Sequence, residues 1–519
     1  MLTLPPELLV EIFVLVLSGW KQSFWELHMA ESHVRESFIT AVDLSRVCKL
    51  FRTVALSAPI LWNHVDMSRD VPAWIVSAML ERSSQASLRV EVNSMTDARI
   101  LERESHRIKA LVYYRRDERE RDTYCMPMLQ ELYIDCESRS RSRQVPFVSS
   151  EFLLPRLRRL SLIGVHPRHA SPFLLPALTH FRFYLYDPIP PLAVLIRALG
   201  NMPLLEKLVL GFDSDSVHWS SEGVQEVTLP RLRGLEVHQS HTACAILLRY
   251  LKFPASTFLS GGFTFFDDEM SRPAVMSAIL SKLSGHGLLG PRPDIDELVI
   301  TGASVCDSLR LGSTIEALKD ETSVYSSSCD VRGASLPINE ALRCLCNVPH
   351  LRFLSRIRHL TLQTPDNTIN EIPEFPSTRL TLRLRNLRYL HLKYAPTLWY
   401  GLTRLHYRLA ADPIPHTAPM PFPKLRYLDI SNAPFRSKPP CIGTVDLGDE
   451  DFIFQLRDML KIRRDAGVPL RSLCIWDPID FNGEEDAQIL KAYVEDVVEF
   501  GQTSPEPSTP GEYSDFEPT

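Results

Sequence analysis

The sequence predicts an α/β protein, with helices at its N-terminus and a long array of strand-and-helix units after them. Two observations lead to this prediction. Apolar residues recur at helical spacing within the first sixty residues. A short apolar pattern typical of buried strands then recurs through most of the remaining chain.

The first predicted helix begins near Pro5. Pro5 and Pro6 fit a first helical turn, where backbone N–H groups have no partner inside the helix. Leu8, Ile12 and Val16 follow at intervals of four residues and form an apolar stripe. Because a short helix this apolar is not stable alone in water, we expect it to pack against another element.

A second helix is predicted between Asp43, which can cap it, and Pro59, which ends it. Its apolar residues recur at helical spacing, and they are Leu44, Val47, Cys48, Phe51, Val54 and Ala55.

The residues of these two helices resemble a known family. Leu4-Pro5-Pro6-Glu7-Leu8-Leu9 through Ile12-Phe13, and then Val47-Cys48-Lys49-Leu50-Phe51-Arg52 through Ala55, resemble the F-box. More narrowly, the chain is similar to the F-box proteins abundant in mushroom-forming fungi, which often continue into a segment like Pro59-Ile60-Leu61-Trp62. Two departures are that Phe51 stands where the family usually has Trp, and that residues 18–42 form a longer insert.

The F-box resemblance implies that these helices dock on a Skp-type adaptor within a cullin–RING ubiquitin ligase. Other interpretations are an ordinary core helix or a signal peptide. The latter is disfavoured because no Lys or Arg precedes the apolar run, which Glu7 and Glu11 interrupt. The residues expected at the adaptor contact are Leu4, Pro5, Leu8, Ile12, Val47, Leu50 and Phe51.

The strand pattern is apolar-x-x-apolar-x-apolar, and Pro often stands two residues ahead of it, where it suits the entry of a strand. Further degenerate copies are expected at 62–67, 88–92, 108–113, 258–265 and 308–311. The clear copies begin at Leu129, Leu157, Leu178, Leu205, Leu232, Ile295, Ile357, Leu387, Leu425 and Leu470.

The spacing of these copies resembles that of leucine-rich repeats, whose units have 20–29 residues. The family's usual Asn after the third leucine is absent from nearly every copy. The resemblance therefore implies an irregular solenoid, with parallel strands inside and helices outside. An ordinary multidomain α/β protein is the alternative. The expected domains are an F-box helical domain over 1–60 with its insert at 18–42, a repeat solenoid over 61–480, a helix over 481–500 and a disordered acidic Pro/Ser/Thr-rich tail over 501–519.

The residues between the apolar triplets are expected to face the concave side of the sheet. Tyr, Trp and Arg at such positions are typical of binding hot spots. Arg159, Arg182 and Lys207 come from three successive strands and are expected to form an anion site, for example for a phosphorylated segment. The expected substrate-binding face comprises Tyr133, Arg159, Arg182, Tyr184, Lys207, His238, His359, Tyr389, His391, Tyr427 and Trp476.

Motifs for cofactors and metals are weak. Residues 285–290 match G-x-G-x-x-G, but Pro291 and Pro293 follow where a helix must begin. His238, His241 and Cys244 have ligand spacing, but a structural zinc site needs four ligands. We therefore expect no cofactor, no metal site and no catalytic centre.

Composition limits the class of partner and the compartment. A net charge of −6 gives no overall attraction to nucleic acid or to anionic membranes. The ten cysteines are scattered and suggest reduced thiols in the cytoplasm or nucleus. No apolar run is long enough for a transmembrane helix. The sequence predicts the substrate-recognition subunit of an SCF-type ubiquitin ligase, itself not an enzyme, whose partners are a Skp-type adaptor and an unidentified protein target. The alternative is a leucine-rich-repeat interaction scaffold outside any ligase.

Overall fold

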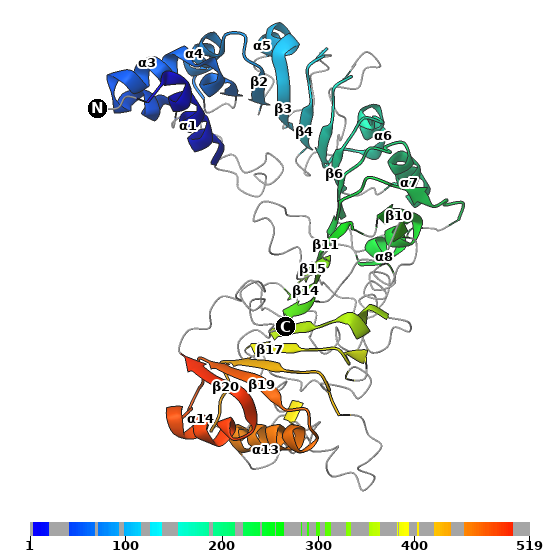
Figure 1. Cartoon of the computed structure of the whole chain (residues 1–519). Helices are drawn as coiled ribbons and strands as arrows, with labels where there is room; N and C mark the ends of the chain where they lie inside the picture. Colours follow the sequence, from blue (N-terminus) through cyan, green and yellow to red (C-terminus); the bar gives the residue numbers. More distant parts are fainter. Residues whose placement is uncertain are drawn as a thin grey trace. The chain divides into compact units, whose positions relative to one another are not determined.

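The computed structural model contains both helices and parallel strands, which confirms the predicted α/β class (Figure 1). The chain divides into two compact units, Met1–Asp213 (unit 1) and Ser214–Thr519 (unit 2). Apart from a few single positions, the structure describes residues 4–19, 41–67, 71–92, 98–115, 125–136, 154–185, 190–212, 222–238, 241–254, 256–263, 288–289, 297–301, 307–312, 329–333, 352–363, 383–393, 420–436 and 451–501.

Unit 1 begins with helix α1 (Pro6–Gly19), a helix over residues 41–47, helix α3 (Lys49–Ser57) and the 3-10 turn η2 (Pro59–Trp62). The single helix predicted between Asp43 and Pro59 is therefore wrong. Cys48 is extended (φ −158°, ψ 173°), and its thiol accepts a hydrogen bond from the Phe51 N–H at 3.4 Å. Cys48 thus caps a new helix, whereas Asp43 lies inside the preceding one.

Within the described residues of unit 1 the sheet is parallel, and its seven strands pair in the order in which they follow along the chain. The early copies expected at 62–67, 88–92 and 108–113 are confirmed as strands. The strands are β1 (His64–Asp66), β2 (Leu88–Val92), β3 (Ile108–Arg115), β4 (Glu131–Cys136), β5 (Arg159–Ile163), β6 (His180–Leu185) and β7 (Lys207–Phe212).

The same tight turn leads into many of these strands. The first apolar residue of a triplet donates its N–H to the carbonyl three residues earlier, as Leu157 does to Leu154 and Leu205 to Met202, at 3.2 Å in both cases. The remaining apolar residues of the triplets are buried, for example Leu160 and Leu162 at 0% exposed. The proline position and the apolar pattern therefore encode one recurring turn-and-strand unit.

Helical segments connect the strands of unit 1 and lie along one side of them in Figure 1. Strands and helical segments therefore alternate along the chain, as in other α/β proteins. These segments are α4 (Ala73–Ser83), α5 (Ala98–Glu104), η4 (Ser105–Arg107), α6 (Pro167–Ala170), η5 (Ser171–Phe173) and α7 (Leu192–Gly200).

Unit 2 has a longer sheet in the order β9-β11-β15-β14-β13-β16-β17-β18-β19-β20. Its strands are β9 (Gly234–His238), β11 (Phe258–Phe263), β13 (Glu297–Thr301), β14 (Asp307–Gly312), β15 (Cys329–Gly333), β16 (His359–Gln363), β17 (Tyr389–Lys393), β18 (Tyr427–Ser431), β19 (Leu470–Trp476) and β20 (Val494–Gly501). A second small sheet joins β8 (Val227–Thr228), β10 (Leu251–Pro254) and β12 (Leu288–Leu289), all parallel. The helical segments in the described part of unit 2 include α8 (His241–Tyr250), η6 (Arg352–Arg356), α13 (Phe452–Asp465) and α14 (Gly483–Lys491).

Strand β14 runs against its neighbours. The hidden copies expected at 258–265 and 308–311 are both strands, but only β11 runs parallel to its partners. β14 is antiparallel to both β13 and β15. The interpretation of 308–311 as one more equivalent repeat is therefore wrong.

The C-terminal part of unit 2 also differs from the prediction. The helix expected over 481–500 ends at Lys491, and Val494–Gly501 form strand β20, parallel to β19. Within the predicted tail, Gly501 ends β20 and residues 502–519 lie outside the described part. Most of the predicted insert, residues 20–40, also lies outside it.

One buried arginine links helix α13 to the turn before β18. The Arg463 side chain is fully buried. It donates hydrogen bonds to the carbonyls of Pro421 at 2.9 Å, Phe422 at 3.2 Å and Leu425 at 3.1 Å. Burial lowers the pKa of Arg463 to about 10, so the guanidinium stays charged at neutral pH. This side chain therefore satisfies backbone acceptors that helix and sheet leave unpaired.

Candidate functional site

The N-terminal helices have a core of their own. Leu9 and Phe13, on one side of α1, pack with Ala55, Leu61 and Trp62 of α3 and η2. Phe13 also meets the ring of Phe51 edge-on, with 4.9 Å between the ring centroids. The first helix therefore packs against other elements of this chain, as expected from the sequence. Only one side of the helix is buried in this way.

Trp62 fixes the end of this core. Its indole N–H donates to the Ala55 carbonyl at 2.8 Å. That carbonyl has no helical partner, because residue 59, four positions on, is a proline without an N–H. The guanidinium of Arg82 lies 4.5 Å from the centre of the Trp62 ring.

Replacing Trp62 by Phe should destabilise the N-terminal helices by about 2 kcal/mol, because the buried Ala55 carbonyl loses its donor and the smaller ring leaves space. Hydrogen exchange of the peptides covering 49–67 would show the loss of protection. Trp74→Phe is the matched control, since Trp74 is 70% exposed and should give a change within about 0.5 kcal/mol. Equal protection in Trp62→Phe and Trp74→Phe would contradict this role for Trp62.

The other side of α1 is apolar and exposed. Leu8 and Ile12 are four residues apart on α1 and so lie on one face, and Leu4 precedes the helix. These three side chains are 42–50% exposed. On either side of Cys48, Val47 is 64% and Leu50 is 41% exposed. We call Leu4, Leu8, Ile12, Val47 and Leu50 the N-terminal apolar surface.

All seven residues predicted for the adaptor contact lie on these helices or next to them. Pro5 is exposed like the five members of the N-terminal apolar surface. Phe51 differs, since it is half-buried against Phe13. The sequence did not separate the two sides of the helices, and the structure does so: Leu9 and Phe13 face the core, and the N-terminal apolar surface faces away from it.

In unit 1, the residues between the apolar triplets align in rows across the strands. In the first row, Glu131, Arg159, His180 and Lys207 are register neighbours on β4, β5, β6 and β7. In a second row, one step along the same strands, Ser161 of β5 lies between Tyr133 and Arg182. The predicted cations therefore do share a face, with Arg159 and Lys207 in one row and Arg182 in the next.

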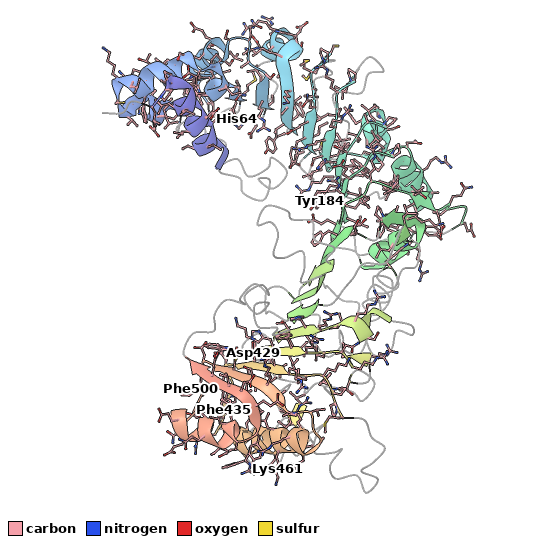
Figure 2. The ribbon with its side chains drawn as sticks, viewed as in Figure 1. His64, Tyr184, Asp429, Phe435, Lys461 and Phe500 are labelled. Atoms are coloured by element: carbon pink, nitrogen blue, oxygen red, sulfur yellow. The ribbon has the colours of Figure 1, made fainter. Side chains whose placement is uncertain are left out.

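Tyr184 lies on this face near the C-terminal end of β6 (Figure 2). A Cβ atom placed on Gly211 would lie 2.2 Å from the Tyr184 ring, so the ring packs directly on the backbone of β7. The guanidinium of Arg182 lies 5.2 Å from the centre of the same ring. Tyr133 differs from the exposed contact that we expected. It is 4% exposed, with its ring against Tyr114 and its hydroxyl donating to Asp135 at 3.3 Å.

Two buried carboxylates lie at the start of the second row. Asp66 of β1 and Glu91 of β2 are register neighbours and are 8% and 7% exposed. Burial raises the pKa of Glu91 to about 8, and the nearby charge of Asp66 adds to this effect. Glu91 is therefore largely protonated at neutral pH in the folded protein.

In unit 2, a stack of aromatic rings follows the corresponding face. His359 and Tyr389 stack with 4.3 Å between their centroids, and Tyr389 and Tyr427 stack at 4.2 Å, nearly parallel in both cases. The hydroxyl of Tyr427 accepts a hydrogen bond from Arg471 at 3.4 Å. Because the rings cover each other's faces, the stack presents ring edges and hydroxyl groups outward.

The neighbouring row carries titratable groups from three strands, His391, Asp429 and Cys474. Burial lowers the pKa of His391 to about 4, and raises that of Asp429 to about 6 and that of Cys474 to about 12. His391 lies 3.3 Å from the Ser431 hydroxyl, and the Cys474 thiol donates to Glu499 at 3.9 Å. At neutral pH the thiol keeps its proton, so Cys474 is a poor nucleophile. Asp429 is labelled in Figure 2.

The two remaining residues of the predicted substrate-binding face are Trp476 and His238, and the structure describes the side chain of only the first. Trp476 is half-buried and packs on the last strand, because a Cβ on Gly501 would lie 2.8 Å from its ring. His238 ends β9, and its side chain lies outside the described part, as do those of His241 and Cys244. Glu131, Ser161 and His180 also lie between apolar triplets and were expected on this face, but only the register between strands places them beside the predicted cations.

Among the described residues, no group of three or more His, Cys, Asp or Glu side chains is arranged to hold a metal ion. In the G-x-G-x-x-G segment, Leu288–Leu289 form strand β12, and the glycines lie outside the described part. None of the described helices has the length and apolar character needed to cross a bilayer.

Comparison with known proteins adds no assignment: no protein-family model matches the chain, and no curated protein matches it either.

Proposed function

We propose that this chain is the substrate-recognition subunit of a cullin–RING ubiquitin ligase of the SCF type. The observation that carries the proposal is the N-terminal apolar surface. Helices α1 and α3 bury one apolar side in their own core and keep another exposed. Several large apolar side chains left exposed on two helices that share a core are typical of a protein interaction site, and they coincide with the residues that resemble the F-box.

In this proposal, the F-box helices bind a Skp-type adaptor and the strand region binds the target protein. The parallel register of successive strands and the recurring turn before them support an irregular leucine-rich-repeat solenoid. The strand face offers arginine and aromatic side chains, which are enriched in binding hot spots. The chain would act by holding a target close to the ligase, which raises the local concentration of its lysines.

The test is direct binding of the full-length chain to a purified Skp-type adaptor, measured by isothermal titration calorimetry. The double substitution Leu8→Asp and Ile12→Asp places two carboxylates on the N-terminal apolar surface. It should weaken binding by about 100-fold or more, since two hot-spot contacts are lost. Both side chains are more than 40% exposed, so the fold should persist, as circular dichroism would verify.

Val194→Asp is the matched control, because Val194 is 52% exposed on α7, away from the N-terminal apolar surface. It should leave the affinity unchanged. Failure of the unaltered chain to bind the adaptor would overturn the proposal and favour the scaffold alternative. Equal binding by the double variant and the control would show that the contact lies elsewhere.

A further inference from the structure

The first row of unit 1 carries an excess of positive charge. Arg159 lies 3.4 Å from one oxygen of Glu131, and Arg89 lies 3.7 Å from the other. One carboxylate is thus shared between two guanidinium groups. Lys207 has no ion pair within the part of the chain that the structure describes. The row Arg159, His180 and Lys207, which we call the basic row, is therefore only partly neutralised.

A buried hydroxyl beside the basic row lacks a partner. Ser161 is 2% exposed, and among the described residues its Oγ has no hydrogen bond. Ser161 lies two residues after Arg159 on β5, so both side chains share one face of the sheet. Its register neighbour on β6 is Arg182. Leaving a buried hydroxyl unpaired costs about 1–3 kcal/mol, which a bound acceptor would offset.

We propose that Arg159, His180, Arg182 and Lys207, with the hydroxyl of Ser161, bind a phosphate group. A phosphate has several strong acceptor oxygens and a charge near −2, which suits two guanidiniums and an ammonium better than a single carboxylate does. Adjacent strands are about 4.8 Å apart, so long side chains from β5 and β7 can converge on one group above β6. The inference does not depend on the ubiquitin-ligase proposal.

His180 should take up a proton when the phosphate binds. The Thr179 hydroxyl donates to the Arg158 carbonyl at 3.1 Å, so it accepts from His180 Nδ1 at 3.0 Å. Neutral His180 then has its lone pair on Nε2. Burial lowers the pKa of His180 to about 4, and the charges of Arg159 and Lys207 add to this effect.

The charged groups around His180 are Arg159 on β5, Lys207 on β7, Arg182 on its own strand and Glu131 on β4. A bound dianion offsets the three cations and stabilises the imidazolium, whose Nε2 then becomes a donor. Binding of the anion is therefore linked to proton uptake, and it should strengthen as the pH falls.

The experiment uses the full-length chain and four probes: a phosphoserine peptide with Gly and Ser flanks, its unphosphorylated form, inorganic phosphate, and sulfate. Affinities come from isothermal titration calorimetry. Lys207→Gln and Arg159→Gln should each weaken binding of the phosphorylated probes about 10-fold, as expected for losing one charge-assisted contact. The control is Arg197→Gln on α7, an exposed cation outside the basic row, which should change nothing.

Glu131→Gln keeps the shape of the site but removes the competing carboxylate, so it should tighten binding several-fold. A gain of affinity cannot come from misfolding. Sulfate keeps the same charge between pH 6 and pH 8, whereas phosphate does not. A pH dependence of sulfate binding therefore reports on the protein, and His180 is the group expected to cause it. Sulfate should bind more tightly at pH 6 than at pH 8, and His180→Gln should abolish that difference.

The source of the phosphate follows from the probes. A phosphopeptide that binds at least 10-fold more tightly than inorganic phosphate indicates a protein-borne group, and equal affinities indicate a free phosphate compound. If Arg159→Gln and Lys207→Gln bind like Arg197→Gln, or if the phosphorylated and unphosphorylated peptides bind equally, the proposal is wrong.

Discussion

Arg463→Met should destabilise the C-terminal strands of unit 2 by about 3–5 kcal/mol. Methionine keeps much of the length and apolar stem of arginine, but it cannot donate to the carbonyls of Pro421, Phe422 and Leu425. The Phe422 carbonyl keeps its hydrogen bond from the Leu425 N–H, but the carbonyls of Pro421 and Leu425 would be left buried without this donor. Each unpaired buried carbonyl costs about 1–3 kcal/mol. The turn before β18 should loosen first, because all three acceptors belong to it.

Hydrogen exchange of the peptides covering β18 and β19 measures this effect, with β4 and β5 of unit 1 as an internal reference. Arg464→Met is the matched control. The neighbouring Arg464 is exposed, and it donates to the Ala492 carbonyl and lies 5.9 Å from the Tyr493 ring centre. Its loss should cost less than about 1 kcal/mol. Similar protection in the two variants would show that the Arg463 contacts contribute little.

Glu91→Gln should make the first strands of unit 1 more stable at pH 8, but not at pH 4.5. In the folded protein, burial raises the pKa of Glu91 from the ordinary 4.5 to about 8. The folded state therefore binds this proton more tightly than the unfolded state does. The resulting stability is fully present below about pH 4.5 and is lost as the pH rises towards 8. Across that window the loss is on the order of 3–5 kcal/mol, since each pKa unit corresponds to about 1.4 kcal/mol.

The measurement is the midpoint of thermal unfolding, or exchange of peptides covering β1 to β3, at intervals from pH 4.5 to 8.5. Glutamine stays neutral throughout, so its curve should be flatter than that of the unaltered chain. Asp66→Asn is the informative partner variant. It should lower the pKa of Glu91 only in part, because burial is the larger cause. Parallel pH curves for Glu91→Gln and the unaltered chain would contradict a raised pKa.

The strands could be predicted from the sequence because their apolar triplets are local signals. The triplet containing Leu160 and Leu162 is one example. Its apolar-x-x-apolar-x-apolar spacing predicts buried strand residues, and both side chains are buried. Strand direction is not encoded in this way, since the pattern of residues 308–311 reads the same whichever way β14 runs. Val494, Val497 and Phe500 of β20 are three residues apart, a spacing that favours a helix, so the pairing with β19 overrides the local pattern.

The helix break at Cys48 escaped sequence analysis for a related reason. Apolar residues on either side of the break face the same core, so the helical period continues across it. The N-terminal apolar surface was predicted as a set of residues, but its separation from the core depends on how the helices pack. The neighbours of the basic row depend on register between strands about 20–30 residues apart. The cations were therefore predicted as a site, whereas Glu131 and Ser161 were expected on the same face but not beside them.

Strand β14 has a consequence for how the nascent chain assembles on the ribosome. In unit 1 each strand can dock as soon as it emerges, because its partner has just been made. β11 instead joins β9 and then waits for β15, about 66 residues later, because β13 and β14 come in between. At typical translation speeds this edge stays open for roughly 3–13 s, during which it can mispair with other chains.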